Sequence, residues 1–208
     1  MQDTPRTLLF IAGYAGAGKT MIGKIITSKL RGVYIDKDTI TKRVIEEALR
    51  HITGDPNDRL SEFFLTHFKM KEYDCMLDTA WENLKLNPVS VLVAPFTPGK
   101  NGDFFMNKEW VAEINRQCRK INANWHVIWV TSTNDTIRKM LINRKTPRDE
   151  WKLNHWDEYT KMYPDHDDPH LPIKNYTVFP NDGRNLHEIE RDIDKLLVEL
   201  GLTTTPAD

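Results

Sequence analysis

Short apolar runs alternate along the chain with segments whose apolar residues recur at helical spacing. The apolar runs have the length of buried strands and lie at residues 8–12, 33–35, 89–94, 125–130 and 176–179. The segments with helical spacing lie at about residues 19–30, 39–51, 60–86, 110–121, 136–145 and 186–200, and the one at 60–86 is either one long helix or two. Strands that alternate with helices predict an α/β domain in three layers, with a parallel sheet of about five strands flanked by helices.

We expect residues 1–208 to form one domain, because neither a linker nor an internal repeat divides the chain. The last residues, about 203–208, carry no apolar pattern, and we expect a frayed tail there. The chain begins without a signal sequence, and no apolar run approaches the length that spans a membrane. Together with two widely separated cysteines, these features predict a cytoplasmic protein without a membrane partner. The sequence leaves monomer and homodimer open as its oligomeric state.

The first apolar run leads directly into a glycine-rich stretch with the pattern G-x-x-x-x-G-K-[ST]. The stretch consists of Gly13, Tyr14, Ala15, Gly16, Ala17, Gly18, Lys19 and Thr20, and a helical pattern follows it. Glycines and small residues between a strand and a helix let several backbone N–H groups point at one anion, beside the positive end of the helix dipole. We therefore expect all eight residues to bind a nucleotide.

Two side chains of this loop have a chemistry of their own. Lys19 places an ammonium group beside the β- and γ-phosphates, and the Thr20 hydroxyl is a ligand for Mg²⁺. No Asn-Lys-x-Asp run, which would indicate guanine recognition, occurs in the chain. The loop therefore predicts binding of a nucleoside triphosphate, with ATP and Mg²⁺ as the expected cofactors.

Two carboxylates, Asp36 and Asp38, follow the second apolar run. The carboxyl ends of parallel strands meet at one edge of the sheet, so this pair is expected beside the phosphate loop. One carboxylate can support Mg²⁺ while the other accepts the proton of an attacking hydroxyl. The alternative is a solvated acidic turn in which Asp38 caps the following helix.

A basic segment after the fourth run has the composition of a mobile lid, at about residues 138–165. Arg144 and Arg148 are its candidate functional side chains, because a guanidinium can stack on adenine or stabilise a transferring phosphoryl group. The alternative is a solvated helix face.

Two absences narrow the class of protein. The third apolar run ends at Ala94-Pro95 without the aspartate that holds Mg²⁺ in many phosphate-loop ATPases and GTPases. Support for the metal therefore shifts to Thr20 and Asp36, and a motor or switch is disfavoured. The 29 basic and 30 acidic residues balance, so the net charge disfavours a nucleic-acid partner.

The order of the phosphate loop, Asp36-x-Asp38, the segment Arg144-Lys145-Thr146-Pro147-Arg148 and Asn181-Asp182-Gly183 resembles small-molecule kinases of the phosphate-loop superfamily. Shikimate, gluconate and adenylylsulfate kinases and chloramphenicol phosphotransferase are examples. The resemblance implies the three-layer phosphate-loop fold with a small helical lid. It further implies that Asp38 faces the acceptor hydroxyl, Asp36 supports Mg²⁺, Arg144 stacks on adenine, Arg148 reaches the γ-phosphate, and Asn181 and Gly183 border the adenine. Lys37 stands where these relatives often have a small residue, and the acceptor-binding arginines of shikimate kinase have no clear match.

The hypothesis is an ATP-dependent kinase that transfers the γ-phosphate to a hydroxyl of a small molecule. Asp38 would orient or deprotonate that hydroxyl, Lys19 and Arg148 would neutralise developing charge, and Arg43, one helical turn past Asp38, would contact the acceptor. A metabolite, a nucleoside and an antibiotic all remain open as acceptor, and the last would make the protein a resistance factor. A polynucleotide 5′-hydroxyl kinase is the nearest alternative, and an ATP-hydrolysing switch without an acceptor is a more distant one.

Overall fold

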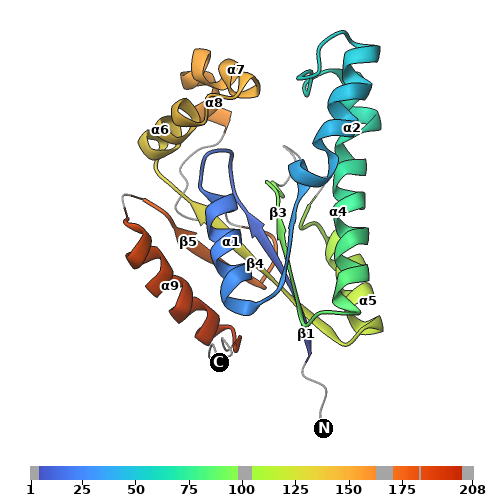
Figure 1. Ribbon diagram of the computed structural model, residues 1–208, viewed down its shortest axis with the longest axis vertical. Coiled ribbons are helices and arrows are strands. Elements are labelled where there is room, and N and C mark those ends of the chain that lie inside the picture. The colour runs from blue at the N-terminus through green and yellow to red at the C-terminus, as the bar shows by residue number, and fades with distance from the viewer. Residues whose placement is uncertain (1–4, 98–104, 163–170, 183, 203–208) are drawn as a thin grey trace.

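Five parallel strands form one sheet at the centre of the protein, in the order β2-β3-β1-β4-β5 (Figure 1). The computed structural model describes residues 5–97, 105–162, 171–182 and 184–202. The strands are β1 (Arg6–Ala12), β2 (Val33–Asp36), β3 (Val89–Val93), β4 (Ala123–Thr131) and β5 (Tyr176–Pro180). The expected parallel sheet is confirmed, with β1 paired to β3 on one side and to β4 on the other.

Helices connect the strands and cover both faces of the sheet. They are α1 (Lys19–Leu30), α2 (Lys37–Ile52), α3 (Glu62–His67), α4 (Lys69–Leu84), α5 (Lys108–Lys120), α6 (Asn134–Arg144), α7 (Glu150–Asn154), α8 (Trp156–Met162) and α9 (Leu186–Glu199), with a 3₁₀ turn η1 (Pro147–Asp149). The segment predicted as one helix or two is two helices, α3 and α4, which meet at Phe68. None of the helices in the described part of the chain has both the length and the apolar character needed to cross a bilayer.

The second helix differs from the sequence-based expectation at its start. It begins at Lys37 rather than near Thr39, because Asp36 caps it: the Asp36 Oδ1 accepts a hydrogen bond of 3.1 Å from the Thr39 N–H. A carboxylate at this position satisfies a backbone donor that has no partner within the helix. The interpretation of Asp38 as the capping residue is therefore wrong, and Asp38 lies in the first turn of α2.

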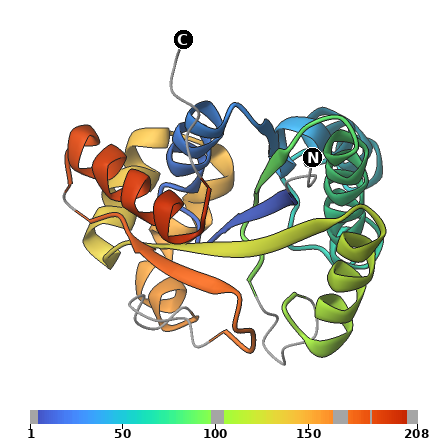
Figure 2. The ribbon, with the colours of Figure 1, turned by 90° about the horizontal axis from the view of Figure 1, so that it is seen from below.

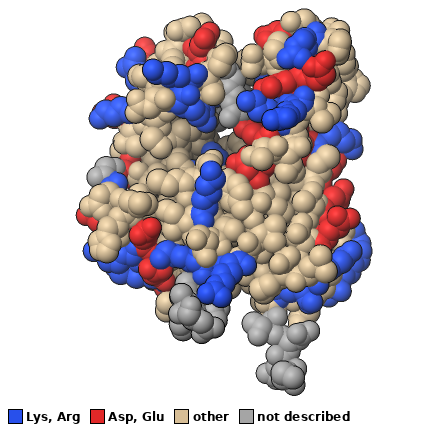
Figure 3. Space-filling view, viewed as in Figure 1, with Lys and Arg blue, Asp and Glu red and all other residues tan. Residues whose placement is uncertain are grey.

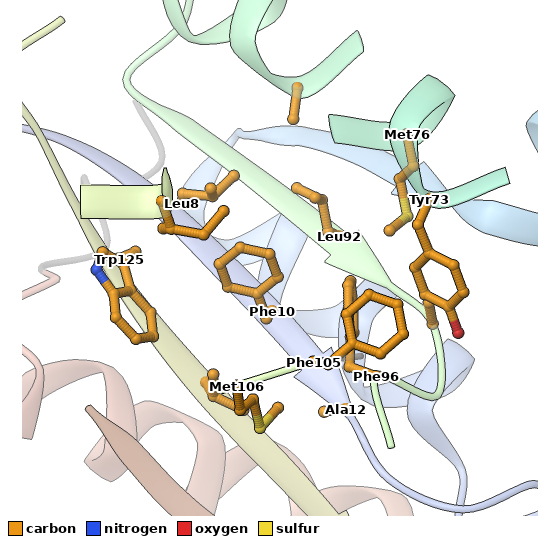
Figure 4. Close-up of a cluster of buried hydrophobic side chains, with 14 of the residues drawn as sticks. Leu8, Phe10, Ala12, Tyr73, Met76, Leu92, Phe96, Phe105, Met106 and Trp125 are labelled. Carbon is orange, nitrogen blue, oxygen red and sulfur yellow. The ribbon is translucent and has the colours of Figure 1, made fainter. Parts of the chain in front are cut away.

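Alternate residues of β1 supply the two halves of the main core. Leu8, Phe10 and Ala12 face α4 and α5, whereas Leu9 and Ile11 face α1 and α9, and all five side chains are inaccessible to solvent (Figure 2). Figure 4 shows Phe10 at the centre of the first half, among Leu92, Trp125, Tyr73 and Met76 and others. A strand buried on both faces explains why the run at 8–12 shows no polar alternation.

Two smaller cores lie beyond the carboxyl ends of the strands. One, between α2 and α3, consists of Ile45, Leu49 and Phe64. The other, between α6 and α8, consists of Ile137, Leu141 and Tyr159. These two helical segments rise on opposite sides of the strand ends in Figure 1, so they stand as two walls over the sheet edge.

The helix α1 can approach the sheet closely because it carries Gly23. A Cβ at this position would lie 2.5 Å from Cγ2 of Val93 and 3.3 Å from Cε2 of Tyr34. We expect Gly23→Val to lower the free energy of unfolding by about 1–3 kcal/mol through overpacking. Ser28→Val, on the exposed side of the same helix, should change it by less than about 0.5 kcal/mol. Urea denaturation of both variants measures the free energy of unfolding. Equal decreases in the two variants would contradict the close approach of α1 to the sheet at Gly23.

Candidate active site

The phosphate loop turns sharply between β1 and α1. Gly13 and Gly18 adopt φ angles of 133° and 95°, which are left-handed values that favour glycine. A Cβ at Gly13 would collide with the Val130 carbonyl of β4, and one at Gly18 would collide with the Asn181 amide. Glycine is thus required at both positions to let the loop lie against the ends of the neighbouring strands.

The residues that follow β4 and β5 hold the loop from outside. The Asn181 Nδ2 donates to the Ala17 carbonyl oxygen at 2.9 Å, and the Ser132 hydroxyl lies 3.3 Å from the same oxygen. Both side chains are buried. Asn181 therefore contacts the loop itself, its contact with adenine stays a prediction, and Gly183 lies outside the described residues.

The Lys19 ammonium folds back onto the loop, where its Nζ donates to the Tyr14 carbonyl oxygen at 2.8 Å. Burial, together with the nearby cations Arg144 and Lys152, lowers the pKa of Lys19 to about 7 against the opposing effect of Asp38 and Asp36. Without an anion beside it, this lysine is only partly charged near neutral pH. The ring of Tyr14 packs edge-on against Trp129, with centroids 5.5 Å apart.

A tyrosine joins the two expected metal ligands. The Tyr34 hydroxyl donates to Asp36 Oδ2 at 3.2 Å, and the Thr20 side chain hydrogen-bonds to the same hydroxyl. Burial, with the Asp36 charge, raises the pKa of Tyr34 above its ordinary value. Sequence reasoning missed Tyr34, although residues two apart on a strand share a face and Asp36 is two residues further on.

These oxygen donors fit a magnesium ion that a nucleotide brings with it. Mg²⁺ prefers hard oxygen ligands and usually binds through one or two protein groups together with phosphates and water. The described residues contain no cluster of three or more His, Cys, Asp or Glu side chains suited to a metal. Thr20, which is exposed, and the partly buried Asp36 supply the two protein groups that such a site needs.

Asp38 lies beside the phosphate loop and is held by its neighbour. The Lys37 Nζ is 2.9 Å from Asp38 Oδ1 and also 2.9 Å from Oε2 of Glu72 on α4. Glu72 is only 2% exposed and also accepts from Thr41 and Arg59. Glu72 lies four residues before the buried Met76, on the buried stripe of α4, and that spacing is the signal by which the sequence could have identified it.

Arg43 lies on a different face of α2 from Asp38. It is exposed, and five residues of helix turn its side chain by about 140° relative to Asp38. The buried face of α2 carries Lys37, Thr41 and Ile45. The acceptor role of Arg43 stays a prediction.

On the opposite wall, a buried carboxylate organises the basic segment. Asp149 accepts hydrogen bonds from Arg144 Nε at 2.7 Å, from the Thr146 hydroxyl at 2.5 Å and from Lys152 Nζ at 2.7 Å. Burial alone would raise the pKa of Asp149, but the hydrogen bonds from Lys152 and Thr146 and the neighbouring positive charge hold it below its ordinary value. Sequence reasoning missed both Asp149 and Lys152, and the side chain of Arg148 lies outside the described residues.

The two walls enclose a cleft lined with both signs of charge. Figure 3 shows the cleft between α6–α8 on one side and α2 on the other, with basic and acidic side chains on both. Arg144, Lys152, Asp36 and Asp38 all influence the charge of Lys19. The structure thus gathers the candidate side chains of three separate sequence segments around the phosphate loop.

Comparisons with known proteins bear on this arrangement. No family model matches the sequence. The shikimate kinase of Azobacteroides pseudotrichonymphae genomovar. CFP2 is 27% identical over 144 residues, which cover 67% of this chain and 68% of that protein. The shikimate kinase structure from Bacteroides thetaiotaomicron aligns over 94% of this chain and 99% of its own, with a TM-score of 0.53 and 20% identity. A gluconokinase from Sinorhizobium meliloti 1021 aligns over 96% and 95%, with a TM-score of 0.53 and 14% identity.

This chain has the phosphate-loop kinase fold. The resemblance to small-molecule kinases of that superfamily is confirmed by one distant sequence relative and by the solved structures. At these identities the solved structures support the fold, and the roles of individual side chains rest on the geometry described above.

The lowered pKa of Lys19 predicts that nucleotide binding takes up a proton. At about pH 8 the free protein holds Lys19 mostly neutral, whereas phosphates beside it favour the ammonium form, so binding should absorb up to about one proton. Nucleotide affinity should fall as the pH rises above about 7. Calorimetric titration with MgATP in buffers of different ionisation enthalpy measures the uptake. Lys19→Arg, whose guanidinium stays charged, should show little uptake, and absence of uptake in the wild type would contradict the prediction.

The arrangement around Asp149 predicts that this carboxylate positions the basic wall. Asp149→Asn leaves Arg144 and Lys152 without their buried counter-charge, and we expect the KM for ATP to rise at least about tenfold. Asp157→Asn, at an exposed position of α8, should leave it within about twofold. Steady-state ATP consumption, with circular dichroism to confirm folding, checks both variants. An unchanged KM in folded Asp149→Asn would show that the wall is not needed for nucleotide binding.

Proposed function

We propose that this protein is an ATP- and Mg²⁺-dependent kinase that transfers the γ-phosphoryl group to a hydroxyl of a small molecule. The observation that supports this most is the placement of Lys19 and Asp38 at one sheet edge, close enough for the carboxylate to influence the charge of the ammonium. A phosphate-binding loop beside a carboxylate supplies a donor side and an acceptor side. The similarity to shikimate kinase and gluconokinase agrees with an alcohol as acceptor.

In the proposed reaction, the loop N–H groups and Lys19 bind and orient the phosphates. Asp38 accepts the proton of the acceptor hydroxyl, the hydroxyl oxygen forms a bond to the γ-phosphorus, and the bond from that phosphorus to the β–γ bridging oxygen breaks to leave ADP. Mg²⁺, held with Thr20 and Asp36, would neutralise charge on the phosphates when it is bound. The Lys37 ammonium forms an ion pair with the Asp38 carboxylate and holds it in place.

We further propose that residues 1–208 act as one domain and that the segment from α6 to α8 is its lid. Arg144 would lie over the adenine, and Lys152, which the geometry adds to the candidates, would approach the γ-phosphate beside Arg148. The support for this is that Arg144 and Lys152 already lower the pKa of Lys19. Closing the lid would exclude water from the transferring group.

Substitution of Asp38 separates transfer from binding. We expect Asp38→Asn to reduce the rate of phosphoryl transfer about 10²–10⁴-fold, because the amide cannot accept the proton, while MgATP affinity changes little. Asp74→Asn, exposed on α4, is the matched control. Transfer is measured with γ-labelled ATP over sugars, polyols, nucleosides and aminoglycoside- or amphenicol-type antibiotics. Undiminished transfer in the variant would remove Asp38 from the mechanism.

The same experiment decides between the proposal and its alternatives. Label on a 5′-hydroxyl oligonucleotide, with none on small molecules, would identify a polynucleotide kinase. Release of labelled phosphate with no labelled acceptor in any arm would identify a hydrolytic switch. Lys19→Ala should abolish productive ATP binding in every arm, since the loop then loses its ammonium.

A further inference from the structure

Four side chains form a line of alternating charge from the proposed acceptor side into the interior. Asp38 Oδ1 contacts Lys37 Nζ at 2.9 Å, Lys37 contacts Glu72 Oε2 at 2.9 Å, and Glu72 Oε1 contacts Arg59 Nη1 at 2.7 Å. The Thr41 hydroxyl donates to the same Oε1 at 2.8 Å. We call these four charged residues the acceptor-side charge chain.

The acceptor-side charge chain is buried at its centre and partly exposed to solvent at its two ends. The Glu72 side chain is 2% exposed and that of Lys37 is 9%, whereas Arg59 and Asp38 are 21% and 33% exposed. Aromatic rings line the buried part: Lys37 Nζ lies 5.6 Å from the centre of the Tyr73 ring, which packs against Phe96 and Phe105. In such surroundings an ion that loses its partner is strongly destabilised.

Both cations of the acceptor-side charge chain, Lys37 and Arg59, are therefore already paired with Glu72. An acceptor carboxylate or phosphate competes with Glu72 for Arg59 and Lys37, and drawing either cation away would leave the buried Glu72 charge without that partner. The four charges sum to zero, and Asp36 adds a further negative charge at the same edge. An uncharged acceptor disturbs none of these contacts.

We propose that Glu72 is a specificity-determining residue, which holds Arg59 and Lys37 and so restricts the acceptor to uncharged polyhydroxyl compounds. This deepens the kinase function proposed above and rests on it. Glu72 acts through the two cations rather than on the reacting atoms, and Thr41 and Lys37 keep its carboxylate in place.

The test uses matched acceptor pairs that differ in one charge, such as glucitol with gluconate and ribitol with ribonate. The wild type should show a kcat/KM at least about tenfold higher for the uncharged member of any pair that is phosphorylated. Glu72→Gln keeps the size of the side chain but frees its cations, so this preference should fall at least about tenfold. A wild type that prefers the carboxylated member, or a folded Glu72→Gln with unchanged preference, overturns the proposal.

Three further variants guard against a merely structural effect. Glu82→Gln, the same change at an exposed position of α4, should leave the preference unchanged. Glu72→Asp keeps the charge and should retain most of the preference. Glu72→Gln combined with Arg59→Gln removes the freed guanidinium but not the freed Lys37, and should restore part of the preference, whereas a double variant that behaves like Glu72→Gln alone contradicts the role of Arg59. Thermal melting confirms folding in each case, and if Glu72→Gln does not fold, the wild-type preference and the Glu72→Asp variant still decide.

A second readout does not depend on catalysis. Calorimetric titration of the carboxylated compounds should show an affinity gain of at least about tenfold in Glu72→Gln over the wild type. If no acceptor becomes labelled while MgATP binds, the proposed function fails. The specificity proposal is then judged by binding alone, and no gain of anion affinity in the folded variant refutes it.

Discussion

The phosphate loop can lie against the ends of β4 and β5 only because Gly13 and Gly18 carry no side chain. This close approach brings the Ala17 carbonyl within reach of Asn181 and Ser132, which are buried and fixed by the sheet. The loop is thereby held in shape before a ligand arrives, and a site that is already formed avoids the ordering cost of binding. The phosphate loop is thus a fixed element of the site, and the charged side chains on the two walls of the cleft lie around it.

Charge is arranged around the phosphate loop by the same means on both walls of the cleft. On each wall one buried carboxylate, Glu72 or Asp149, binds two cations and one hydroxyl. A buried carboxylate is costly without such partners and firmly placed with them, so each wall has a defined arrangement of its charged groups. Lys19, between the walls, is the group whose charge depends on both, since Arg144 and Lys152 lower its pKa while Asp38 and Asp36 raise it.

The sequence predicted the parts of the structure that depend on local pattern. The apolar run at 8–12 predicted a strand buried on both faces, and the loop from Gly13 to Thr20 predicted the turn into α1 at its observed start. The start of α2 was predicted wrongly, because both Asp36 and Asp38 are good capping residues and only the backbone geometry selects between them. The partners of Glu72 could not be predicted, since Glu72 meets Arg59 and Lys37 across gaps of 13 and 35 residues, and tertiary packing alone brings them together.

The small core between α2 and α3 is separate from the residues that hold the phosphate loop. Ile45, Leu49 and Phe64 pack under the wall that α2 and α3 form, apart from the residues that fix the phosphate loop to the sheet. We therefore expect substitutions in that wall to leave the contacts of Ala17, Asn181 and Ser132 intact. Solved relatives named for shikimate and gluconate share this fold at 20% identity or less. In the kinase proposed above, a donor site fixed by backbone packing lies beside an acceptor side fixed by replaceable ion pairs, an arrangement that would let the acceptor change while the nucleotide site stays the same.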